Sequence, residues 1–334
     1  MKLFAAILVI LVAAVVGAVA GLAWITNSNQ VDDATRAAPA GGSFVKAADV
    51  QIFVQQAGPA DGTPVLFVHG TGAWSEAWRE PMNALAKDGR RAIAIDLPPF
   101  GYSGRPQPPS YSKVDQGKRI LGVLDALQIQ KAVLVAHSFG GGPAMEAVLL
   151  APGRFQAVVL VDAALSIAPE GVEQVAPPSF LARTGLASRV LRNTLAGAFL
   201  ANPRFTRTLL TKFIDDPARA TDDWVEVYRR PLHVAGTTAA VGDWLPALLA
   251  PGALAASERP GSYASLGMPL FLIWGERDTI TPLAQAQRLA KLAPAVELTV
   301  MNNVGHIPQI EDTAAFTALL RQVVAKASSP SSNR

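Results

Sequence analysis

The amino-acid sequence predicts an α/β fold with a mostly parallel central sheet and helices on both of its faces. The first observation is that short apolar runs, such as Val133–Ala136, alternate with segments of helical spacing. Runs of this kind are typical of strands that are buried on both faces of a parallel sheet. The second observation is that the 334 residues are 50% hydrophobic and 16% charged, which provides material for a large core. Together these features favour a sheet sandwiched between two layers of helices.

The expected strands are short apolar or alternating segments that end at turn residues. Helical spacing separates most of them, which implies parallel crossover connections. The expected strands are two within Ser43–Gln56, then Pro64–Val68, Arg91–Ile95, Val133–Ala136, Gln156–Val161, Pro269–Trp274 and Val296–Met301. The expected helices of this part are Ser75–Lys87, Ser112–Leu127, Ala144–Leu150 with Pro143 in its first turn, Pro282–Leu292 and one after Asp312.

The alternation of strands and helices stops in the middle of the chain. Between Pro177 and Pro251 only helical patterns occur, and the strand pattern resumes at Pro269. We therefore predict a helical cap at residues 165–262, inserted into an α/β core made of residues 43–164 and 263–326. The expected helices of the cap are Phe180–Leu200, Phe205–Ile214, Trp224–His233 and Thr237–Leu249.

The N-terminal segment is long and apolar. After Met1 and Lys2, residues 3–25 contain no charged or strongly polar side chain, and Trp24 lies near the far end. This length is enough to cross a bilayer as a helix, and an aromatic residue is common at the interface. We predict that residues 1–25 form a transmembrane anchor. Because Lys2 precedes the run, the remaining domain is expected outside the cytoplasm.

A cleaved signal peptide is the alternative interpretation of this segment. Ala18-Val19-Ala20 has the form of a cleavage site, although the apolar run is longer than that of a usual signal. Cleavage would make the domain a secreted one. Residues 26–42 are polar and then rich in Ala, Pro and Gly, which predicts a flexible linker.

Composition excludes several classes of function. The net charge is +3 and no aromatic-studded basic stripe occurs, so a nucleic-acid partner is not expected. The absence of Cys excludes disulfides, a cysteine nucleophile and thiolate metal sites. No Walker A sequence, G-x-G-x-x-G after the first strand or H-E-x-x-H occurs. The spacing of the four His residues does not suit a metal site, and no cofactor is predicted: they are His69, His137, His233 and His306.

Ser138 is the candidate nucleophile. It lies between an expected strand and an expected helix, in the stretch His137-Ser138-Phe139-Gly140. A sharp turn between these elements lifts the hydroxyl clear of its neighbours, and small residues two before and two after let the turn close. Gly140 occupies the second of these places, and Ala136 stands where the G-x-S-x-G pattern has its first Gly.

A serine nucleophile needs a base and an acid that orients it. His306 follows an expected strand and comes last in the order Ser, acid, His, so it is the candidate base. Asp278 follows the strand that ends at Trp274 and is the candidate acid. Asp162, after an earlier strand, and Glu276 are alternatives that the sequence leaves open. All of these lie at the carboxyl ends of strands, where sites of parallel sheets occur.

Two other features complete the candidate site. The oxyanion formed during acyl transfer needs two N–H donors. One candidate is the backbone N–H of Phe139, directly after the nucleophile, and the other is that of Thr71, in the glycine-flanked loop after Val68. Asp96, at the end of its own strand, is expected to tie the loop that follows and to play a structural part.

These motifs together resemble the α/β-hydrolase fold superfamily, in the capped branch that includes epoxide hydrolases, haloalkane dehalogenases, carbon–carbon bond hydrolases and many esterases. The resemblance implies Ser138 as nucleophile, His306 as base, Asp278 as acid, and the amides of Thr71 and Phe139 as the oxyanion hole. The matching stretches are HGTGAW at 69–74, DLPPFGYSG at 96–104, AHSFGG at 136–141, WGERD at 274–278 and GHIPQIE at 305–311.

Some residues depart from the pattern of the branch. Epoxide hydrolases and haloalkane dehalogenases carry Asp as nucleophile, so Ser138 argues against both activities. Pro99 stands where the loop of the family usually has Gly. No Trp follows Gly305-His306, as it does in many carbon–carbon hydrolases, and this disfavours that subgroup.

Three functions remain open at the level of sequence. The leading one is a serine hydrolase that cleaves an ester or related acyl bond of an apolar small molecule through an acyl-enzyme. The alternative is carbon–carbon bond hydrolysis or a cofactor-free perhydrolase or haloperoxidase-like reaction that uses the same triad. The third is a membrane-tethered binding protein without catalysis. The expected partners are a small-molecule substrate and a membrane, and no signal for an oligomeric state is present.

Overall fold

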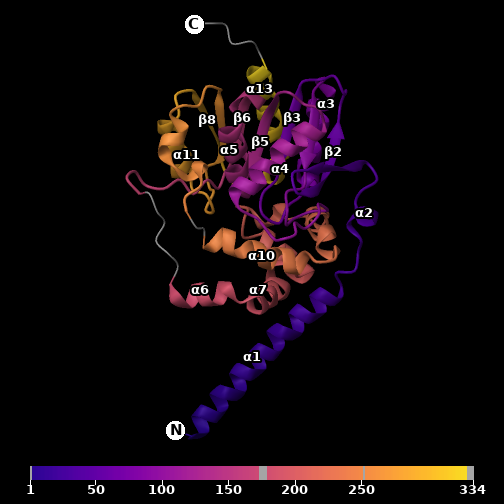
Figure 1. Cartoon of the computed structure of the whole chain (residues 1–334), viewed down its shortest axis with the longest axis vertical. Coiled ribbons are helices and arrows are strands. Elements are labelled where there is room, and N and C mark those ends of the chain that lie inside the picture. The colour runs from indigo at the N-terminus through magenta and orange to yellow at the C-terminus, as the bar shows by residue number, and fades with distance from the viewer. Residues whose placement is uncertain (1, 173–178, 251–252, 329–334) are drawn as a thin grey trace.

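The computed structural model describes residues 2–172, 179–250 and 253–328 and contains a central eight-stranded sheet (Figure 1). The order of the strands across the sheet is β1-β2-β4-β3-β5-β6-β7-β8. β1, β2 and β4 pair in antiparallel fashion, and the other neighbours are parallel. The strands are β1 Gly42–Ala47, β2 Val50–Ala57, β3 Pro64–Val68, β4 Arg91–Ile95, β5 Ala132–His137, β6 Phe155–Val161, β7 Leu270–Gly275 and β8 Val296–Met301. The predicted α/β class with a mostly parallel sheet is confirmed.

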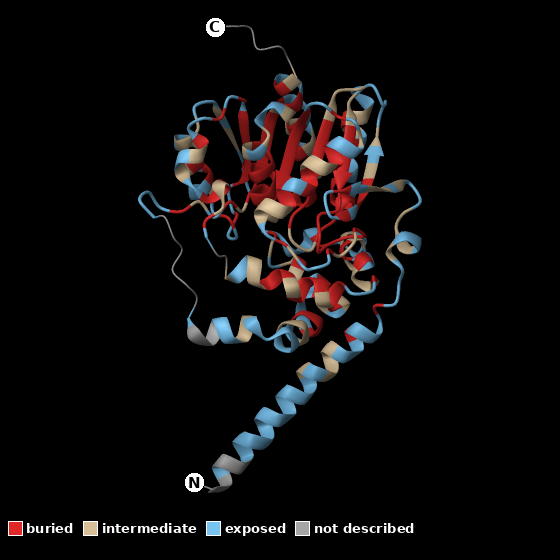
Figure 2. Cartoon of the chain, in the orientation of Figure 1, coloured by how far each residue is buried: buried red, intermediate tan, exposed pale blue. Residues whose placement is uncertain are grey.

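Helices cover both faces of the sheet because its central strands are apolar throughout. In β3, Leu66 and Val68 face one layer, whereas Val65 and Phe67 face the other. The first layer contains α4 Lys113–Ala126, α5 Gly141–Leu150 and α11 Leu283–Leu292, and the second contains α3 Arg79–Lys87 and α13 Thr313–Ser328. Burial of these apolar faces is the main stabilising contribution to the core. Figure 2 shows the resulting band of buried strands.

A helical block lies between β6 and β7 and covers the carboxyl ends of the strands (Figure 1). The sequence predicts a single helix over Phe180–Leu200, and the structure divides this stretch at Ser188. There the Ser188 hydroxyl accepts the N–H of Leu191 and so begins a new helix. The elements of the block are α6 Phe180–Ala187, α7 Arg189–Leu195, the π-helix η4 Ala196–Leu200, α8 Thr206–Leu210, α9 Asp222–Arg229 and α10 Thr237–Leu249.

The N-terminal helix α1 spans Lys2–Ser28 and projects away from the body of the molecule (Figure 1). Its segment Ile7–Ser28 is long and apolar enough to cross a membrane, and its mean hydropathy is 2.7. A signal sequence near the N-terminus has the same properties, so this observation alone is weak support for an anchor.

Within residues 26–42, where the sequence predicts a flexible linker, several residues contact the block of helices and the core. α1 continues to Ser28, and a short helix α2 occupies Ala34–Ala37. Asp32 forms an isolated bridge with Val234, and the Gln30 side chain accepts the N–H of Thr238 at 2.9 Å. Polar residues of this segment therefore form hydrogen bonds with the block. Composition alone cannot distinguish a polar segment that bonds to the protein from one that is exposed to water.

Candidate active site

Ser138 lies at a sharp turn between β5 and α5. Its φ angle is +49°, a left-handed value that is unusual for a residue with a side chain and marks a strained turn. A Cβ atom on Gly140 would lie only 2.7 Å from the carbonyl oxygen of His69, which explains the small residue there. The helix begins at Gly141, three residues before the predicted Ala144, and Pro143 lies in its first turn as the sequence predicts.

The three predicted side chains form a continuous chain of hydrogen bonds. The Ser138 Oγ lies 2.8 Å from Nε2 of His306, and Nδ1 of His306 lies 2.8 Å from Oδ2 of Asp278. All three residues are at most 5% exposed. This arrangement allows the imidazole to take the serine proton while the carboxylate holds the ring in one tautomer.

Asp278 is fixed by the turn that follows β7. Its Oδ1 accepts the backbone N–H groups of Ile280 and Thr281, and the Thr281 hydroxyl donates to its Oδ2 at 2.6 Å. Burial raises the pKa of Asp278. The hydrogen bond and charge of His306 and the hydrogen bonds from Thr281 lower this pKa by more, so the net shift is downward. The carboxyl group is therefore ionised and suited to orient His306.

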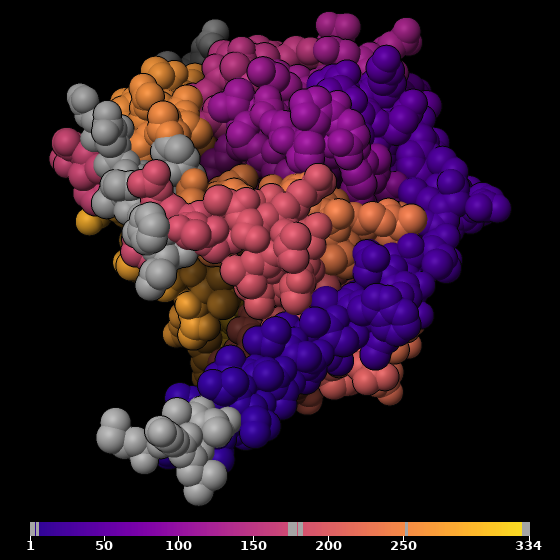
Figure 3. Space-filling model, turned by 60° about the horizontal axis from the view of Figure 1, so that its bottom comes forward, coloured from indigo at the N-terminus to yellow at the C-terminus, as the bar shows by residue number. Residues whose placement is uncertain are grey.

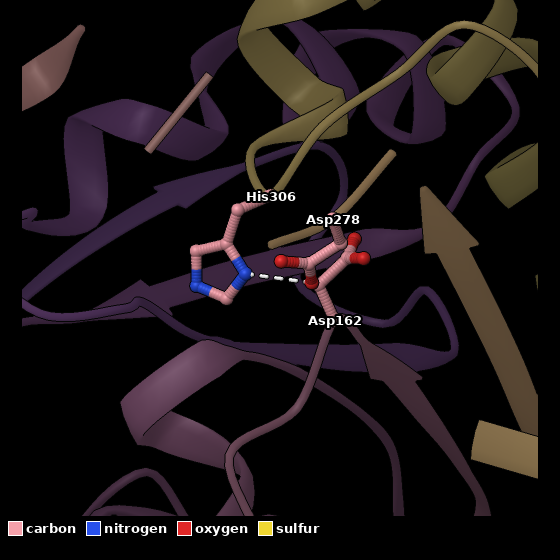
Figure 4. Close-up of side chains that lie close together, drawn as sticks. All are labelled: Asp162, Asp278 and His306. Carbon is pink, nitrogen blue, oxygen red and sulfur yellow. Dashed lines mark hydrogen bonds and ion pairs between the residues drawn. The ribbon is translucent and has the colours of Figure 1, made fainter. Parts of the chain in front are cut away.

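Asp162, the alternative acid, lies beside Asp278 rather than against His306 (Figure 4). Its Oδ1 accepts the N–H of Gly275 at 2.8 Å, whereas its Oδ2 is buried without a donor among the described residues. Burial, the charge of Asp278 and a hydrogen bond to Asp278 raise the pKa of Asp162 well above its usual value. The raised pKa of Asp162 and the lowered pKa of Asp278 favour a proton on Asp162 and a charge on Asp278.

The other two acidic residues that the sequence singles out lie away from the triad. Glu276 accepts the N–H of Asn303 near the surface. Asp96 is buried and accepts the N–H groups of Ser75 and Tyr102, each at 2.7 Å. Burial raises the pKa of Asp96 to about 6. Asp96 thus ties two loops at the strand ends, in agreement with the structural part predicted for it.

Sequence reasoning missed the residues that hold the backbone around the triad. The Nε2–H of His137 donates to the carbonyl oxygen of His306 at 2.7 Å. Glu311 accepts the N–H groups of Gly305 and Ile307, on either side of the base. His137 directly precedes Ser138 in the sequence, and Glu311 lies five residues after His306, but neither spacing indicates a contact with the base.

His69 fixes the loop that precedes Thr71. Its Nε2 accepts the N–H of Leu97 and its Nδ1–H donates to the Gly70 carbonyl oxygen, both at 2.8 Å. Burial lowers the pKa of His69 to about 4, and burial together with the neighbouring His306 lowers that of His137 to about 3. Both imidazoles are therefore neutral at physiological pH and act as hydrogen-bonding supports.

The loop that contains Thr71 lies against the nucleophile. A Cβ atom on Gly70 would lie 2.6 Å from Nδ1 of His137 and 3.0 Å from Cβ of Ser138. Gly72 has a φ of +72°, which glycine adopts without strain. The loop before Thr71 thus lies in van der Waals contact with the turn that carries Ser138, and the amides of Thr71 and Phe139 stay the predicted oxyanion donors.

The side chains at the triad are poorly suited to bind a metal ion. Asp162, Asp278 and His306 each place one ligand atom within 4.8 Å of the others. Both ring nitrogens of His306 already lie at hydrogen-bond distance from Ser138 and Asp278. An ion bound at Nδ1 would break the contact with Asp278, so this cluster fits proton transfer better than ligation.

A cavity of about 120 Å³ lies between the core and the block of helices, and one of its lining residues, Ile307, directly follows His306. The core contributes Thr71, Gly72, Phe100 and Ile307, whereas the helical block contributes apolar side chains including Phe213 and Trp244. None of the described residues that line the cavity is charged. Two lining hydroxyl groups, those of Thr206 and Tyr228, are buried and lack a partner among the described residues.

Comparison with known proteins agrees with this geometry. The sequence profile described as alpha/beta hydrolase fold matches residues 63–313, which is most of the chain. The chain belongs to the alpha/beta hydrolase fold family. The resemblance predicted from the motifs is therefore confirmed, and so is the α/β-hydrolase fold of the central sheet.

Relatives within this family include hydrolases of carbon–carbon bonds. The chain is 32% identical over 272 residues to the 2-hydroxymuconate semialdehyde hydrolase of Pseudomonas sp. (strain CF600), an alignment that covers 80% of this chain and 88% of that protein. It is also similar to the structure of a meta-cleavage product hydrolase from Pseudomonas fluorescens IP01, with 28% identity, a TM-score of 0.66, and coverage of 86% and 98%. The absence of a Trp after His306 disfavours this subgroup, whereas these two similarities favour it.

A second solved structure resembles this chain over nearly its whole length. It is a membrane phospholipase A described as a bacterial virulence factor, with a TM-score of 0.67, 20% identity, and coverage of 99% of this chain and 100% of that one. At this identity the likeness shows only a shared fold.

Proposed function

We propose that this family member is a serine hydrolase that attacks a carbonyl carbon of an apolar small molecule. The observation that carries the proposal is the unbroken hydrogen-bond chain from Ser138 through His306 to Asp278. The side chain of Ser138 attacks the carbonyl carbon while Nε2 of His306 takes the hydroxyl proton. The developing oxyanion is stabilised by the N–H groups of Thr71 and Phe139.

The second half of the reaction uses the same groups. His306 gives its proton to the leaving group, and water then enters. His306 deprotonates this water, which attacks the acyl-enzyme and releases the acid product. Asp278 stays ionised throughout and stabilises the imidazolium. A binding protein without catalysis has no need for this ordered set of buried contacts, which argues against the third function considered from sequence.

Carbon–carbon bond hydrolysis is the first reaction class that we propose. The matched relatives support it, since one is a 2-hydroxymuconate semialdehyde hydrolase and another a meta-cleavage product hydrolase. In such a reaction the acyl carbon stays on Ser138, and the leaving carbon takes the proton that His306 carries.

Ester hydrolysis is the second candidate, and the lining of the cavity favours it. The named substrate of the first relative carries a carboxylate, whereas the described lining of this cavity offers no cation to pair with one. A neutral, mostly apolar substrate fits this lining better. The hydroxyl groups of Thr206 and Tyr228 are then available for one polar group of that substrate.

The domain arrangement and location belong to the same proposal. Residues 43–164 and 263–326 form the catalytic core, and residues 165–262 form a cap that shapes the pocket and excludes water. α1 anchors the chain in a membrane with the core outside the cytoplasm, or is removed as a signal sequence.

The test compares two substrates with the full chain and its Ser138→Ala variant. One substrate is 2-hydroxymuconate semialdehyde and the other is a series of p-nitrophenyl esters of increasing chain length. We expect turnover of at least one class, and a loss of at least about a thousandfold in kcat for the variant. The ratio of kcat/KM for the two classes then chooses between the candidates. Equal rates with and without Ser138 would contradict the proposal.

A further inference from the structure

The cap carries a row of exposed apolar side chains on α7 and η4. These residues, called the apolar cap face below, are Val190, Leu191, Leu195, Phe199 and Leu200, and each is between 40% and 79% exposed. Leu191, Leu195 and Phe199 follow one another at intervals of four residues and share one side of the helix. Scattered exposed apolar residues are normal, but a continuous group of five marks an interaction surface.

The apolar cap face adjoins the helix that we propose as the membrane anchor. α1 packs against η4 and α7 near its carboxyl end, where Val19 and Leu22 are half-buried. The contact is close, because a Cβ atom on Gly197 would lie 3.3 Å from the Cα and the carbonyl oxygen of Ala23. Figure 3 shows α1 lying directly against this part of the cap.

The register of α1 sets the depth of this contact relative to a bilayer. The candidate span Ile7–Ser28 rises about 32 Å, which matches a hydrocarbon thickness of about 30 Å. Ala23 lies within the last two turns of this span, and the exposed Trp24 follows it near the outer end, where interfacial aromatic residues occur. Because Gly197 packs on Ala23, η4 lies at the same level.

Basic residues lie one step further out. A cleft between the end of α1 and the cap is lined by Ile25, Thr26 and Asn29 of the helix end together with Arg204 and Arg229. At this level the phosphate groups of lipids are the expected neighbours of an arginine. The order along α1 is thus apolar residues, then Trp24, then arginines, which is the order found across a membrane interface.

From these contacts we propose that the apolar cap face inserts into the outer leaflet of the bilayer in which α1 is anchored, and that substrate enters the cavity from that leaflet. Leu200 belongs both to the apolar cap face and to the lining of the cavity. Leu200 thus joins the apolar cap face to the cavity, and the proposal places the entry of an apolar molecule at this residue. The proposal rests on the anchor proposed above and specifies the substrate as one that partitions into lipid.

The test uses the absence of Cys from the natural chain, which makes an introduced Cys a unique labelling site. Leu191→Cys and Leu150→Cys, in the full chain, are each labelled with the fluorophore NBD and reconstituted into phosphatidylcholine vesicles. Leu150 is a matched control, because it lies in the α/β core at the end of α5 and is 49% exposed against 44% for Leu191.

We expect the emission of the label at 191 to be blue-shifted. Lipids that carry a nitroxide near the headgroup should quench this emission. The label at 150 should behave as it does in water. Identical, water-like behaviour of both labels would overturn the proposal. A second result would also overturn the proposal. In it, the emission at 191 is blue-shifted, nitroxide lipids do not quench it, and the shift disappears when the protein is diluted in lipid. A second copy of the chain would then cover the apolar cap face.

A second measurement follows substrate entry and depends on the hydrolase activity. In the double variant Leu191→Gln/Leu195→Gln, hydrolysis of a long-chain ester held in vesicles should fall about tenfold, while that of a short soluble ester stays unchanged. Leu150→Gln should change neither rate. An equal loss on both esters would contradict entry from lipid. If the parent hydrolyses neither ester, the proposed ester activity fails, but the labelling result still decides whether the cap is inserted.

Discussion

Substitution of Asp162 by Asn tests whether the two neighbouring carboxyl groups carry different charges. If both were ionised within the 4.8 Å that spans the cluster, their repulsion would be at least about 3.5 kcal/mol at an effective dielectric constant of about 20. Asp278 has the hydrogen bonds that favour a charge, so Asp162 is the neutral member. An Asn at 162 keeps an acceptor for the N–H of Gly275 and a donor for Asp278.

The effect on stability has a sign that follows from linkage. The pKa of Asp162 is raised on folding above 3.8, so above pH 3.8 the native state binds a proton that the unfolded state has lost. The contribution of Asp162 to the free energy of unfolding of the parent therefore falls as pH rises. The Asn variant lacks this term, so its stability relative to the parent should rise between pH 4.5 and pH 5.5. Denaturant unfolding of both proteins at the two pH values measures this difference.

The effect on catalysis separates the two acids. Asp162→Asn should keep kcat/KM within about threefold of the parent, because Asp278 still orients His306. Asp278→Asn should lower kcat by about 10⁴, since the amide cannot hold the required tautomer. Asp162→Ala is the matched deletion, and it should cost about 1–3 kcal/mol of stability by leaving the N–H of Gly275 unpaired. The reverse order of the two Asn variants in kcat would refute the assignment, as would a stability difference that does not change with pH.

Three further predictions concern the surroundings of the triad. Gly70→Ala should lower kcat/KM at least about tenfold, because the new methyl would displace His137 or Ser138, while Gly153→Ala, with open space around it, should not change the rate. Tyr228→Phe should raise the free energy of unfolding by about 1 kcal/mol in chemical denaturation, since the buried hydroxyl has no partner among the described residues, and it should raise KM for any substrate that uses this group. Folding lowers the pKa of His69 from 6.5 to about 4, so the parent loses stability as pH falls from 6.5 to 4. His69→Gln lacks this group, and the free energy of unfolding of the variant should therefore depend less on pH in this range. The difference between the two proteins should change by about 1.4 kcal/mol per pH unit. Parallel curves of stability against pH for these two proteins would contradict a neutral, buried His69.

Local sequence pattern was sufficient for the elements whose environment is uniform. Pro64–Val68, Arg91–Ile95 and Val296–Met301 were predicted as strands at the bounds that the structure has, and Thr237–Leu249 as a helix likewise. Each of these segments is a single run of one periodicity that ends at a Gly, Pro or polar turn. Packing in the sheet or within the cap therefore favours the same secondary structure as the local sequence preference does.

The positions of Ser138 and His306 were also readable from sequence, because each lies in a turn that only small neighbours permit. The sequence favours Asp278 as the carboxyl group that orients His306 but leaves Asp162 open. Asp162 and Asp278 both follow strands, β6 and β7 are neighbours in the sheet, and the two side chains come to lie beside one another. Only the turn after β7, with its N–H groups and the hydroxyl of Thr281, gives Asp278 the contacts of an ion.

The sequence by itself predicted the α/β-hydrolase fold, the turn that carries Ser138 and an apolar N-terminal helix, since local periodicity and short motifs indicate each of them. The tertiary structure decided the charge of each carboxyl group, the docking of residues 26–42 and the level of the cap along α1. These depend on distances between segments far apart in sequence, such as Ala23 and Gly197, and on burial that the fold creates. No local pattern encodes such distances, because they follow from how the whole core and the cap pack.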